Sequence, residues 1–334
     1  MPRHRSDKVS VVEAAYLPAL SETEWLEQIV RSAAPFIAEG LGALALIYYG
    51  AKGRLRRGAH ATVDLAFDPT KTFLEPLENF PPEMVDQTWR KLSFGLGSEV
   101  GSLGKLAQHV PAIKTMYDAG VRDVLNINAY DPSGVGVWLG APLPVERKRR
   151  PKEGETWARV GAHLGSALRL RLRNARAKKP DDATAVLDTR GHIAHAKSGK
   201  EADRLSDQLR DAVLRMERAR GSMRRSDPDG AVEIWRTLVD GELTLLDHFE
   251  RGGKRYIVAV ANAAHASSPG IGTLRPRERQ VVVSAAAGRS NKMIAYELGL
   301  AHSTVRVLLA RAAQRLGATS RRELVAMVRA HALP

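Results

Sequence analysis

Arginine and small polar side chains recur at helical spacing over residues 303–316. Apolar residues at Val305, Leu309, Ala312 and Leu316 define one side of a helix. The opposite side then carries Ser303, Arg306, Val307, Ala310 and Arg311. A guanidinium on an exposed helix face can donate paired hydrogen bonds to a phosphate or to the edge of a guanine. The pattern therefore predicts a surface that contacts nucleic acid.

Two further helices are predicted before this one. Pro276 is favoured at a first helical position, because its missing N–H would be unpaired there in any case. Gly288 then ends the helix that Pro276 begins. Ser290 can cap the second helix, which Gly299 terminates. A tight turn containing Gly299 therefore joins the second predicted helix to the arginine-bearing third.

A fourth helix is predicted at the end of the chain. Ser320 and Glu323 have the spacing of a capping box. The helix that follows has a single apolar stripe, formed by Leu324, Val325 and Val328. We expect this stripe to be exposed and to join two copies of the chain into a homodimer.

Two helices joined by a tight turn, the second with a basic outer face, are typical of a helix-turn-helix that inserts its second helix into the DNA major groove. The blocks L-x-P-R-E-R, G-x-S-N-K-x-I-A-x-x-L-G-L, S-T-V-R and R-L-G-A-x-S-R-x-E-L-V follow one another in order. Over residues 270–331 this order resembles the LuxR-type (GerE-like) DNA-binding domain. The resemblance implies an all-α, four-helix domain that binds double-stranded DNA and regulates transcription.

The resemblance also implies two kinds of contact with DNA. The side chains that would reach base edges are Arg306, Val307 and Ala310. Those that would contact phosphates are Asn291, Lys292, Thr304 and Arg315. The predicted interface is completed by polar residues at two helix starts and one further outer-face arginine, which are Ser290, Ser303 and Arg311.

The sequence departs from the family pattern at a few positions. Arg275 and Ala301 stand where a Ser or Thr usually caps a helix, and Leu308 replaces a frequent His. Ala310 is smaller and less polar than the residue usual there. These departures lower the expected stability of two helix ends and weaken the expected base contact at Ala310.

Composition agrees with an anionic partner. The 334-residue chain is long enough for two or three domains and has a formal net charge of +14. Residues 271–334 contain eleven Arg or Lys against three acids, so this segment holds over half of the excess. The chain has no Cys, which is typical of a reducing cytoplasm. Its longest apolar run, residues 41–49, is far short of the roughly 20 residues that span a bilayer. We expect a cytoplasmic protein without a membrane partner.

The first half of the chain alternates helices with strand hairpins. Ser21 and Glu24 form a capping box for a helix, with Leu20 and Trp25 spaced as a hydrophobic staple. The elements expected after it are strands 41–50 and 54–67, a helix 82–96, strands 121–130 and 134–142, and a helix 155–178. Residues 21–178 resemble a GAF-type sensor domain, an antiparallel sheet with helices packed on it, and residues 1–20 form an N-terminal extension. The helix 155–178 is amphipathic and charged, so it suits either a packed terminal helix or a dimerising connector.

Residues 181–264 repeat this organisation on a smaller scale. Two hairpins are expected, at residues 183–196 and 241–264, with helices at 201–223 and 231–239 between them. This order resembles a PAS-like domain. A GAF-like region, a PAS-like region and a LuxR-type module over residues 270–334 together resemble a one-component bacterial regulator. The predicted fold class is α+β, with antiparallel sheets and helices followed by the all-α C-terminal domain.

Residues suited to other chemistry do not form a recognisable site. The glycine-rich stretch 95–104 has Val100 where a dinucleotide fingerprint needs Gly, so a surface loop is predicted. His192 and His195 stand three residues apart in a predicted strand and would point to opposite faces, which disfavours a metal site. No catalytic constellation is evident, so we expect neither an enzyme nor a cofactor.

The aromatic residues of the N-terminal region do not show whether that region binds a ligand. A buried core would account for them as well as a ligand pocket would; they are Tyr48, Tyr49, Trp89, Phe94, Tyr130 and Trp138. The sequence predicts a sequence-specific DNA-binding transcription regulator, controlled by a signal at its N-terminal region. Its expected partners are DNA, a second copy of the chain and RNA polymerase, with a small-molecule ligand of the sensor region left open. The alternatives are a protein-interaction platform and an N-terminal enzymatic domain tethered to DNA.

Overall fold

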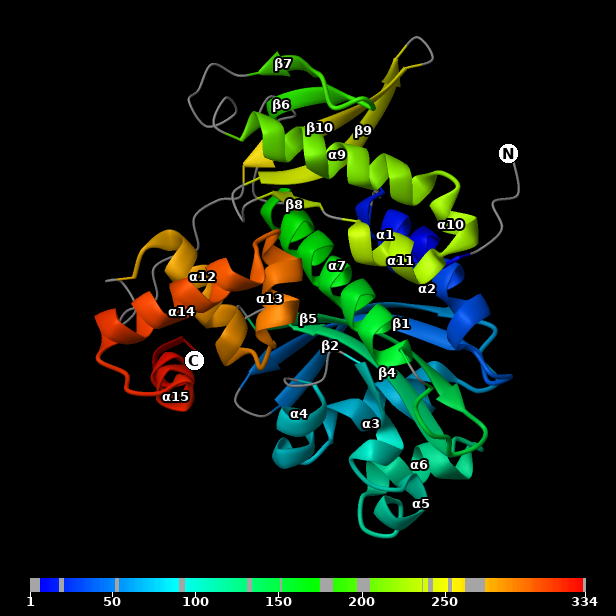
Figure 1. Ribbon diagram of the computed structural model, residues 1–334. Helices are drawn as coiled ribbons and strands as arrows, with labels where there is room; N and C mark the ends of the chain where they lie inside the picture. Colours follow the sequence, from blue (N-terminus) through cyan, green and yellow to red (C-terminus); the bar gives the residue numbers. More distant parts are fainter. Residues whose placement is uncertain are drawn as a thin grey trace. The chain divides into compact units, whose positions relative to one another are not determined.

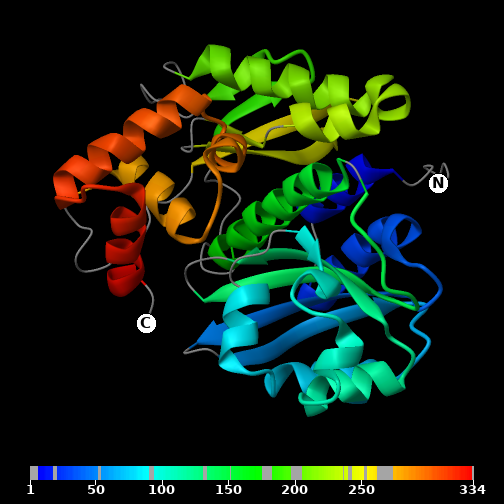
Figure 2. The same cartoon turned by 60° about the horizontal axis from the view of Figure 1, so that its bottom comes forward.

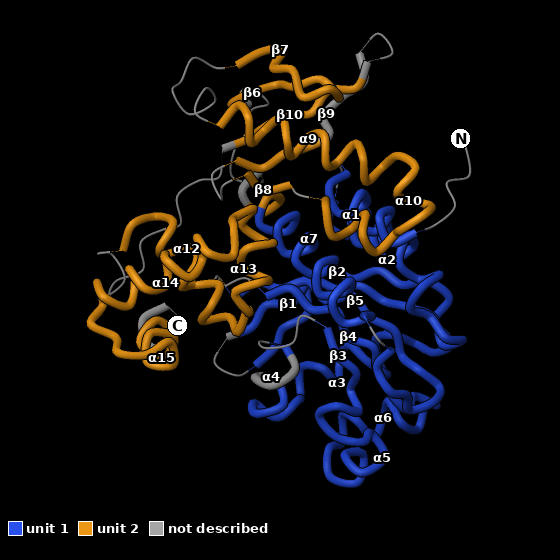
Figure 3. The backbone as a smooth tube through the Cα atoms, viewed as in Figure 1, with its two compact units in different colours: residues 1–169 blue, residues 170–334 orange. Residues whose placement is uncertain are grey.

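The chain divides into two compact units, residues 1–169 and 170–334 (Figure 3). The computed structural model describes residues 7–17, 21–51, 54–89, 94–130, 134–150, 152–174, 183–196, 205–235, 237–239, 243–251, 254–261 and 274–332. Each unit contains a five-stranded antiparallel sheet with helices, and the end of the second unit is wholly helical. The α+β class expected from the sequence is therefore confirmed.

The sheet of the first unit is built from two hairpins and one edge strand. Its strands are β1 (Ala43–Ala51), β2 (Arg54–Val63), β3 (Phe94–Leu96), β4 (Asp123–Tyr130) and β5 (Val135–Leu143). They lie in the order β2-β1-β5-β4-β3. Both predicted hairpins are present, and β1 joins them by pairing with β5, with Leu46 opposite Trp138. Their turn residues 52–53 and 131–133 lie outside the described residues.

Helices cover both faces of this sheet (Figure 2). One layer contains α1 (Lys8–Tyr16), α2 (Glu22–Ile37) and α7 (Glu153–Asn174), whose last turn belongs to the second unit. The other layer contains η1 (Thr70–Leu74), α3 (Glu75–Glu78), α4 (Pro82–Thr88), η2 (Gly97–Glu99), α5 (Leu103–Leu106) and α6 (Pro111–Asp118). Because successive strand residues point to opposite faces, the burial of every residue of β4 reflects this double cover.

The capping box at the start of α2 is confirmed. Ser21 Oγ accepts from the Glu24 amide at 3.1 Å, and Glu24 Oε2 accepts from the Ser21 amide at 3.0 Å. Trp25 is fully buried and donates its indole N–H to the Ala15 carbonyl at 2.8 Å, which fastens α2 to α1. Leu20, the other residue of the predicted staple, lies outside the described residues.

Two predictions for residues 82–104 are wrong. The helix expected over residues 82–96 ends at Thr88, because Phe94 to Leu96 pair with β4 as its edge strand. The glycine-rich stretch is not a surface loop, since it forms the end of β3, η2 and the start of α5. Ser98 fixes this turn by donating its amide and hydroxyl to the Asp123 carboxylate at 2.9 and 2.7 Å.

The sheet of the second unit has the same topology as the first. Its strands are β6 (Ala183–Asp188), β7 (Ile193–Ala196), β8 (Leu238–Val239), β9 (Leu243–Arg251) and β10 (Lys254–Ala261), in the order β7-β6-β10-β9-β8. Both predicted hairpins are present; the turn residues 252–253 lie outside the part of the chain that the structure describes. In each sheet, two hairpins pair through the first strand of one and the second strand of the other, and a short strand lies at one edge.

Three helices lie in the sequence between β7 and β8 of the second sheet: α9 (Ser206–Arg220), α10 (Met223–Ser226) and α11 (Pro228–Ile234). Arg255 of β10 forms an ion pair with Glu217 of α9, which places α9 against the sheet. The helix predicted over residues 231–239 is wrong in its second half. Trp235 takes an extended conformation at the end of α11, and residues 238–239 form β8 because Val239 pairs with Leu243 of β9.

Four helices complete the second unit, as the sequence predicts: α12 (Pro276–Ala286), α13 (Asn291–Leu298), α14 (His302–Leu316) and α15 (Arg321–Ala332), orange to red in Figure 1. Their inward side chains form one apolar core that includes Val281, Ile294, Val305 and Leu324. Within the described residues, no helix is both long and apolar enough to cross a lipid bilayer.

Candidate nucleic-acid interface

Local backbone signals fix the turn between α13 and α14. Ser290 Oγ accepts from the Met293 amide at 3.2 Å and caps the start of α13, as predicted. Gly299 has φ +66°, in the left-handed region that glycine adopts at little cost, and it ends α13. Ala301 then begins α14 without any side-chain cap, as its residue type implies. The turn is therefore short enough to hold α14 at a fixed angle to α13.

The inner face of α14 is slightly wider than the sequence suggested. Val305, Leu309 and Ala312 are buried in the domain core, as expected. Leu308, which the sequence pattern places on neither face, is also buried, at 8% exposure. It stands three residues after Val305, so helical spacing alone could have placed it inward. Four buried side chains thus anchor α14 to the domain.

The predicted outer face of α14 is open to solvent. Ser303, Arg306, Val307, Ala310 and Arg311 are all exposed, and Thr304 is half-buried beside them. Val307 is 47% exposed, which is unusual for a large apolar residue in this chain. An exposed apolar group between two arginines is suited to a thymine methyl, which lies beside hydrogen-bonding base edges in the major groove.

The start of α13 presents a second polar group. Ser290 and Lys292 are exposed, and Asn291 is half-buried. Asn291 Oδ1 accepts a hydrogen bond from Arg321, whose other guanidinium nitrogen donates to the Arg289 carbonyl at 2.9 Å. Arg321 was missed at the sequence level, because nothing in the spacing of the two helix starts shows that they meet. With its oxygen occupied, Asn291 keeps its amide N–H groups for an anionic partner at this helix start.

The three acidic residues of this domain all form hydrogen bonds or ion pairs with other groups of the domain. Glu278 is 1% exposed, and its Oε2 lies 3.2 Å from Arg315 Nε and accepts from the Arg275 amide at 3.0 Å. Glu297 forms a second ion pair, since its Oε1 lies 2.8 Å from Arg289 Nε with both side chains largely buried.

Glu323, the third acid, caps α15. It accepts from the Thr319 hydroxyl and amide, and these hydrogen bonds hold the pKa of the Glu323 carboxyl below its usual value. Glu323 therefore bonds one residue earlier than the predicted capping box requires, although Ser320 Oγ does accept from the Glu323 amide at 3.1 Å. With its acids paired in this way, the described surface of the domain is dominated by positive charge.

Two sequence predictions change in consequence. Arg315, expected to contact phosphate, has an internal partner in Glu278 and is only partly exposed. The apolar stripe of α15 is not an exposed dimerisation surface, because Leu324 and Val328 are 1% and 0% exposed within the domain core. Val325 is partly buried against the same core. A helix with a single apolar stripe buries that stripe against another element, and here α15 packs against α12 of its own domain.

His192 and His195 do not form a pair. His192 lies in the turn after β6, where its Nδ1 is 3.2 Å from Asp188 Oδ2, whereas His195 lies in β7. Among the residues with described positions, no group of three or more His, Asp or Glu side chains is arranged to hold a metal ion.

Comparison with known proteins gives the C-terminal domain a family. Residues 273–328 match the model of the family described as bacterial regulatory proteins, luxR family (GerE). No curated protein matches the chain in sequence.

Solved structures give only weak likeness to the whole chain. One is Escherichia coli SdiA, with 11% identity and a TM-score of 0.32, covering 98% of this chain and 96% of that one. Another is a bacteriophytochrome from the photosynthetic bacterium R. palustris, with 8% identity and a TM-score of 0.33, covering 75% of this chain and 61% of that one.

Proposed function

Because residues 273–328 form a DNA-binding domain of the luxR family of bacterial regulatory proteins, we propose that the chain is a sequence-specific transcription regulator controlled through its N-terminal unit. The observation that carries the proposal is the outer face of α14, which presents Arg306, Val307 and Arg311 to solvent. Four buried side chains hold that helix from behind. A rigid helix with an exposed basic face meets the geometric requirement for entering the major groove.

Each part of the face has a role that its chemistry supports. Arg306 donates to a guanine edge, and Val307 contacts a thymine methyl. Ser303, Thr304 and Arg311 contact the phosphates on either side of the groove. Ala310 packs against the bases without donating.

The start of α13 binds the neighbouring phosphate. Ser290, Asn291 and Lys292 lie there at the positive end of the helix dipole, which favours an anion. The internal pairing of Glu278 and Glu297 supports this assignment, because it removes two negative charges from the path of the DNA.

Other features of the proposal follow from the way such a domain works. The protein acts in the cytoplasm as a homodimer on two half-sites about one helical turn apart, and it contacts RNA polymerase. Its dimer surface lies elsewhere than Leu324 and Val328, which are buried.

A salt titration of binding tests the proposal. The full-length chain is titrated into a labelled duplex at several salt concentrations, and log K is plotted against log[salt]. Release of condensed counterions predicts a steep negative slope that flattens by about 0.9 for each lost phosphate contact. Arg311→Ala should flatten the slope by that amount.

Arg190→Ala is the matched control. Arg190 is an exposed arginine in the turn after β6, outside the DNA-binding domain. Its truncation removes the same charge and should leave the slope unchanged. Affinity that does not fall with salt, or an equal effect of both truncations, contradicts the proposal.

A further inference from the structure

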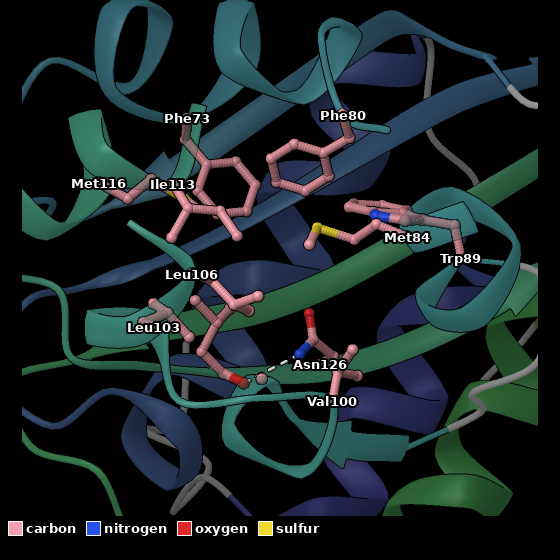
Figure 4. A pocket seen from close by; sticks show the side chains of 12 residues that line it. Phe73, Phe80, Met84, Trp89, Val100, Leu103, Leu106, Ile113, Met116 and Asn126 are labelled. Atoms are coloured by element: carbon pink, nitrogen blue, oxygen red, sulfur yellow. Dashed lines mark hydrogen bonds between the residues drawn. The ribbon is translucent and has the colours of Figure 1, made fainter. Parts of the chain in front are cut away.

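A pocket lies in the first unit between the sheet and the helical layer formed by α3 to α6 (Figure 4). Its volume is about 60 Å³. A single water needs roughly 10–15 Å³ measured in this way, so the pocket has room for a small organic molecule. The wall is almost entirely apolar and includes Phe73, Phe80, Met84, Leu106, Ile113 and Met116. None of the described residues that line it is charged.

Trp89 contributes an unpaired hydrogen-bond donor to this wall. Its side chain is 2% exposed, and its Nε1 has no acceptor among the described residues. Figure 4 shows the indole, nitrogen included, extending from the end of α4 toward the other lining side chains. Buried N–H groups are nearly always paired, because leaving one without an acceptor is costly.

The neighbouring Trp138, unlike Trp89, has an acceptor for its indole N–H among the described residues. Trp138 lies 5.7 Å from Trp89 between ring centroids, and its indole N–H donates to Asn126 Oδ1 at 2.9 Å. Asn126, which also lines the pocket, uses one amide N–H to reach the Val124 carbonyl at 2.9 Å. Asn126 of the sheet thus provides the acceptor for Trp138, whereas no described residue accepts a hydrogen bond from Trp89 Nε1.

Trp89 is held in position from behind. Its carbonyl accepts from Tyr48 Oη at 3.1 Å and from Asn128 Nδ2, and both donors are buried. The Tyr48 and Trp89 rings also pack edge to face, 5.0 Å apart and at 80°. An indole fixed in this way is preorganised, so a ligand that accepts its hydrogen bond does not have to order the side chain.

We propose that this pocket is a binding site for a small, uncharged and largely apolar molecule that bears one carbonyl oxygen. The apolar wall buries its hydrocarbon part, and Trp89 Nε1 donates to the carbonyl. Binding itself does not depend on the proposed function, but the role of this molecule as the signal for a DNA-binding regulator rests on it.

The test compares two probes of nearly the same shape, cyclohexanone and methylenecyclohexane. Only cyclohexanone accepts a hydrogen bond. Binding of each to the full-length chain is followed by ligand-observed NMR. Trp89→Phe keeps an aromatic ring and removes the N–H, so it should weaken cyclohexanone about 3- to 10-fold and leave methylenecyclohexane nearly unchanged. Val100→Phe fills the partly exposed side of the pocket and should abolish the binding of both.

Trp235→Phe is the matched control, because Trp235 Nε1 is also buried with no acceptor among the described residues, and Trp235 belongs to the second unit and does not line the pocket. It should change neither probe. The proposal is overturned if neither probe binds, if Val100→Phe has no effect, or if Trp89→Phe leaves cyclohexanone unchanged.

If Trp89→Phe disturbs the fold and loses both probes, the indole N–H signals of the unaltered chain decide. One of them should move downfield with cyclohexanone and not with methylenecyclohexane, and the absence of any such shift overturns the proposal. DNA binding is measured separately, so its failure would remove the signalling role and leave the site.

Discussion

The ion pair between Glu278 and Arg315 should stabilise the C-terminal domain, and truncating Arg315 should expose its contribution. Glu278 Oε2 receives only the Arg275 amide and the Arg315 guanidinium, and Glu278 Oε1 has no partner among the described residues. Arg315→Ala would therefore leave a carboxylate that is 1% exposed with a single hydrogen bond.

The expected loss of stability depends on how deeply each partner of the ion pair is buried. Removing one partner of a fully buried ion pair costs about 3–5 kcal/mol. The Arg315 side chain is 40% exposed, so water screens part of the interaction. We expect Arg315→Ala to lower the stability of the domain by about 1–3 kcal/mol, whereas loss of an exposed arginine costs within roughly 0.5 kcal/mol.

Hydrogen exchange measured on peptides from α12 and α14 is the suitable assay. It reports the opening of this domain alone, whereas a global unfolding curve would mix several domains. Arg311→Ala is the control, since it removes the same charge from the exposed face of the same helix. Glu278→Gln combined with Arg315→Ala should recover most of the loss, because the stranded charge is gone. Equal protection in Arg315→Ala and Arg311→Ala, or no recovery in the double variant, would refute the reasoning.

Three further predictions concern the same domain. Ser290→Ala removes the cap of α13 and should reduce exchange protection of that helix by about 1 kcal/mol. Val307→Ser should leave the fold intact and lower affinity for a thymine-containing site about 5- to 100-fold, measured by fluorescence anisotropy, because a serine cannot pack on the thymine methyl. The lowered pKa of Glu323 stabilises the start of α15 above the usual Glu pKa, so protection there should fall as pH drops through the lowered value. Glu323→Gln should flatten that pH dependence in exchange data corrected for intrinsic rates.

Local signals made the C-terminal domain predictable. Pro276 and Ser290 mark helix starts, and Gly288 and Gly299 mark helix ends with positive φ angles of 84° and 66°. Each of these residues acts through its own backbone or its immediate neighbours. The four helices and the outward direction of Arg306 could therefore be deduced without knowledge of tertiary contacts.

The features that the sequence did not reveal depend on contacts between segments that are distant in the chain. Residues 94–96 and 238–239 are too short for a strand pattern, and they become edge strands only because β4 and β9 offer them partners. The ion pair of Glu278 and Arg315 joins two helices whose contact no spacing rule records. Periodicity likewise places Leu324 on an apolar stripe, but it does not say whether the chain itself or a second copy covers that stripe.

The pocket also depends on contacts between distant segments, which the sequence does not reveal. The sequence favours a core role over a ligand role for Trp89 and Trp138, but it does not distinguish one tryptophan from the other. Only the hydrogen-bond partners separate them, since Trp138 donates to Asn126 and Trp89 has no acceptor among the described residues.

The central claim is that the exposed face of α14 selects a DNA sequence. Binding-site selection from a random duplex library tests it most directly, with the full-length chain, Arg306→Ala, and Arg322→Ala, an exposed arginine on α15, as control. We predict that the unaltered chain and Arg322→Ala enrich one and the same motif. Arg306→Ala should lose preference at one guanine of that motif, a discrimination of about 1–3 kcal/mol. Enrichment of no motif by the unaltered chain, or an unchanged motif in Arg306→Ala, would contradict the account.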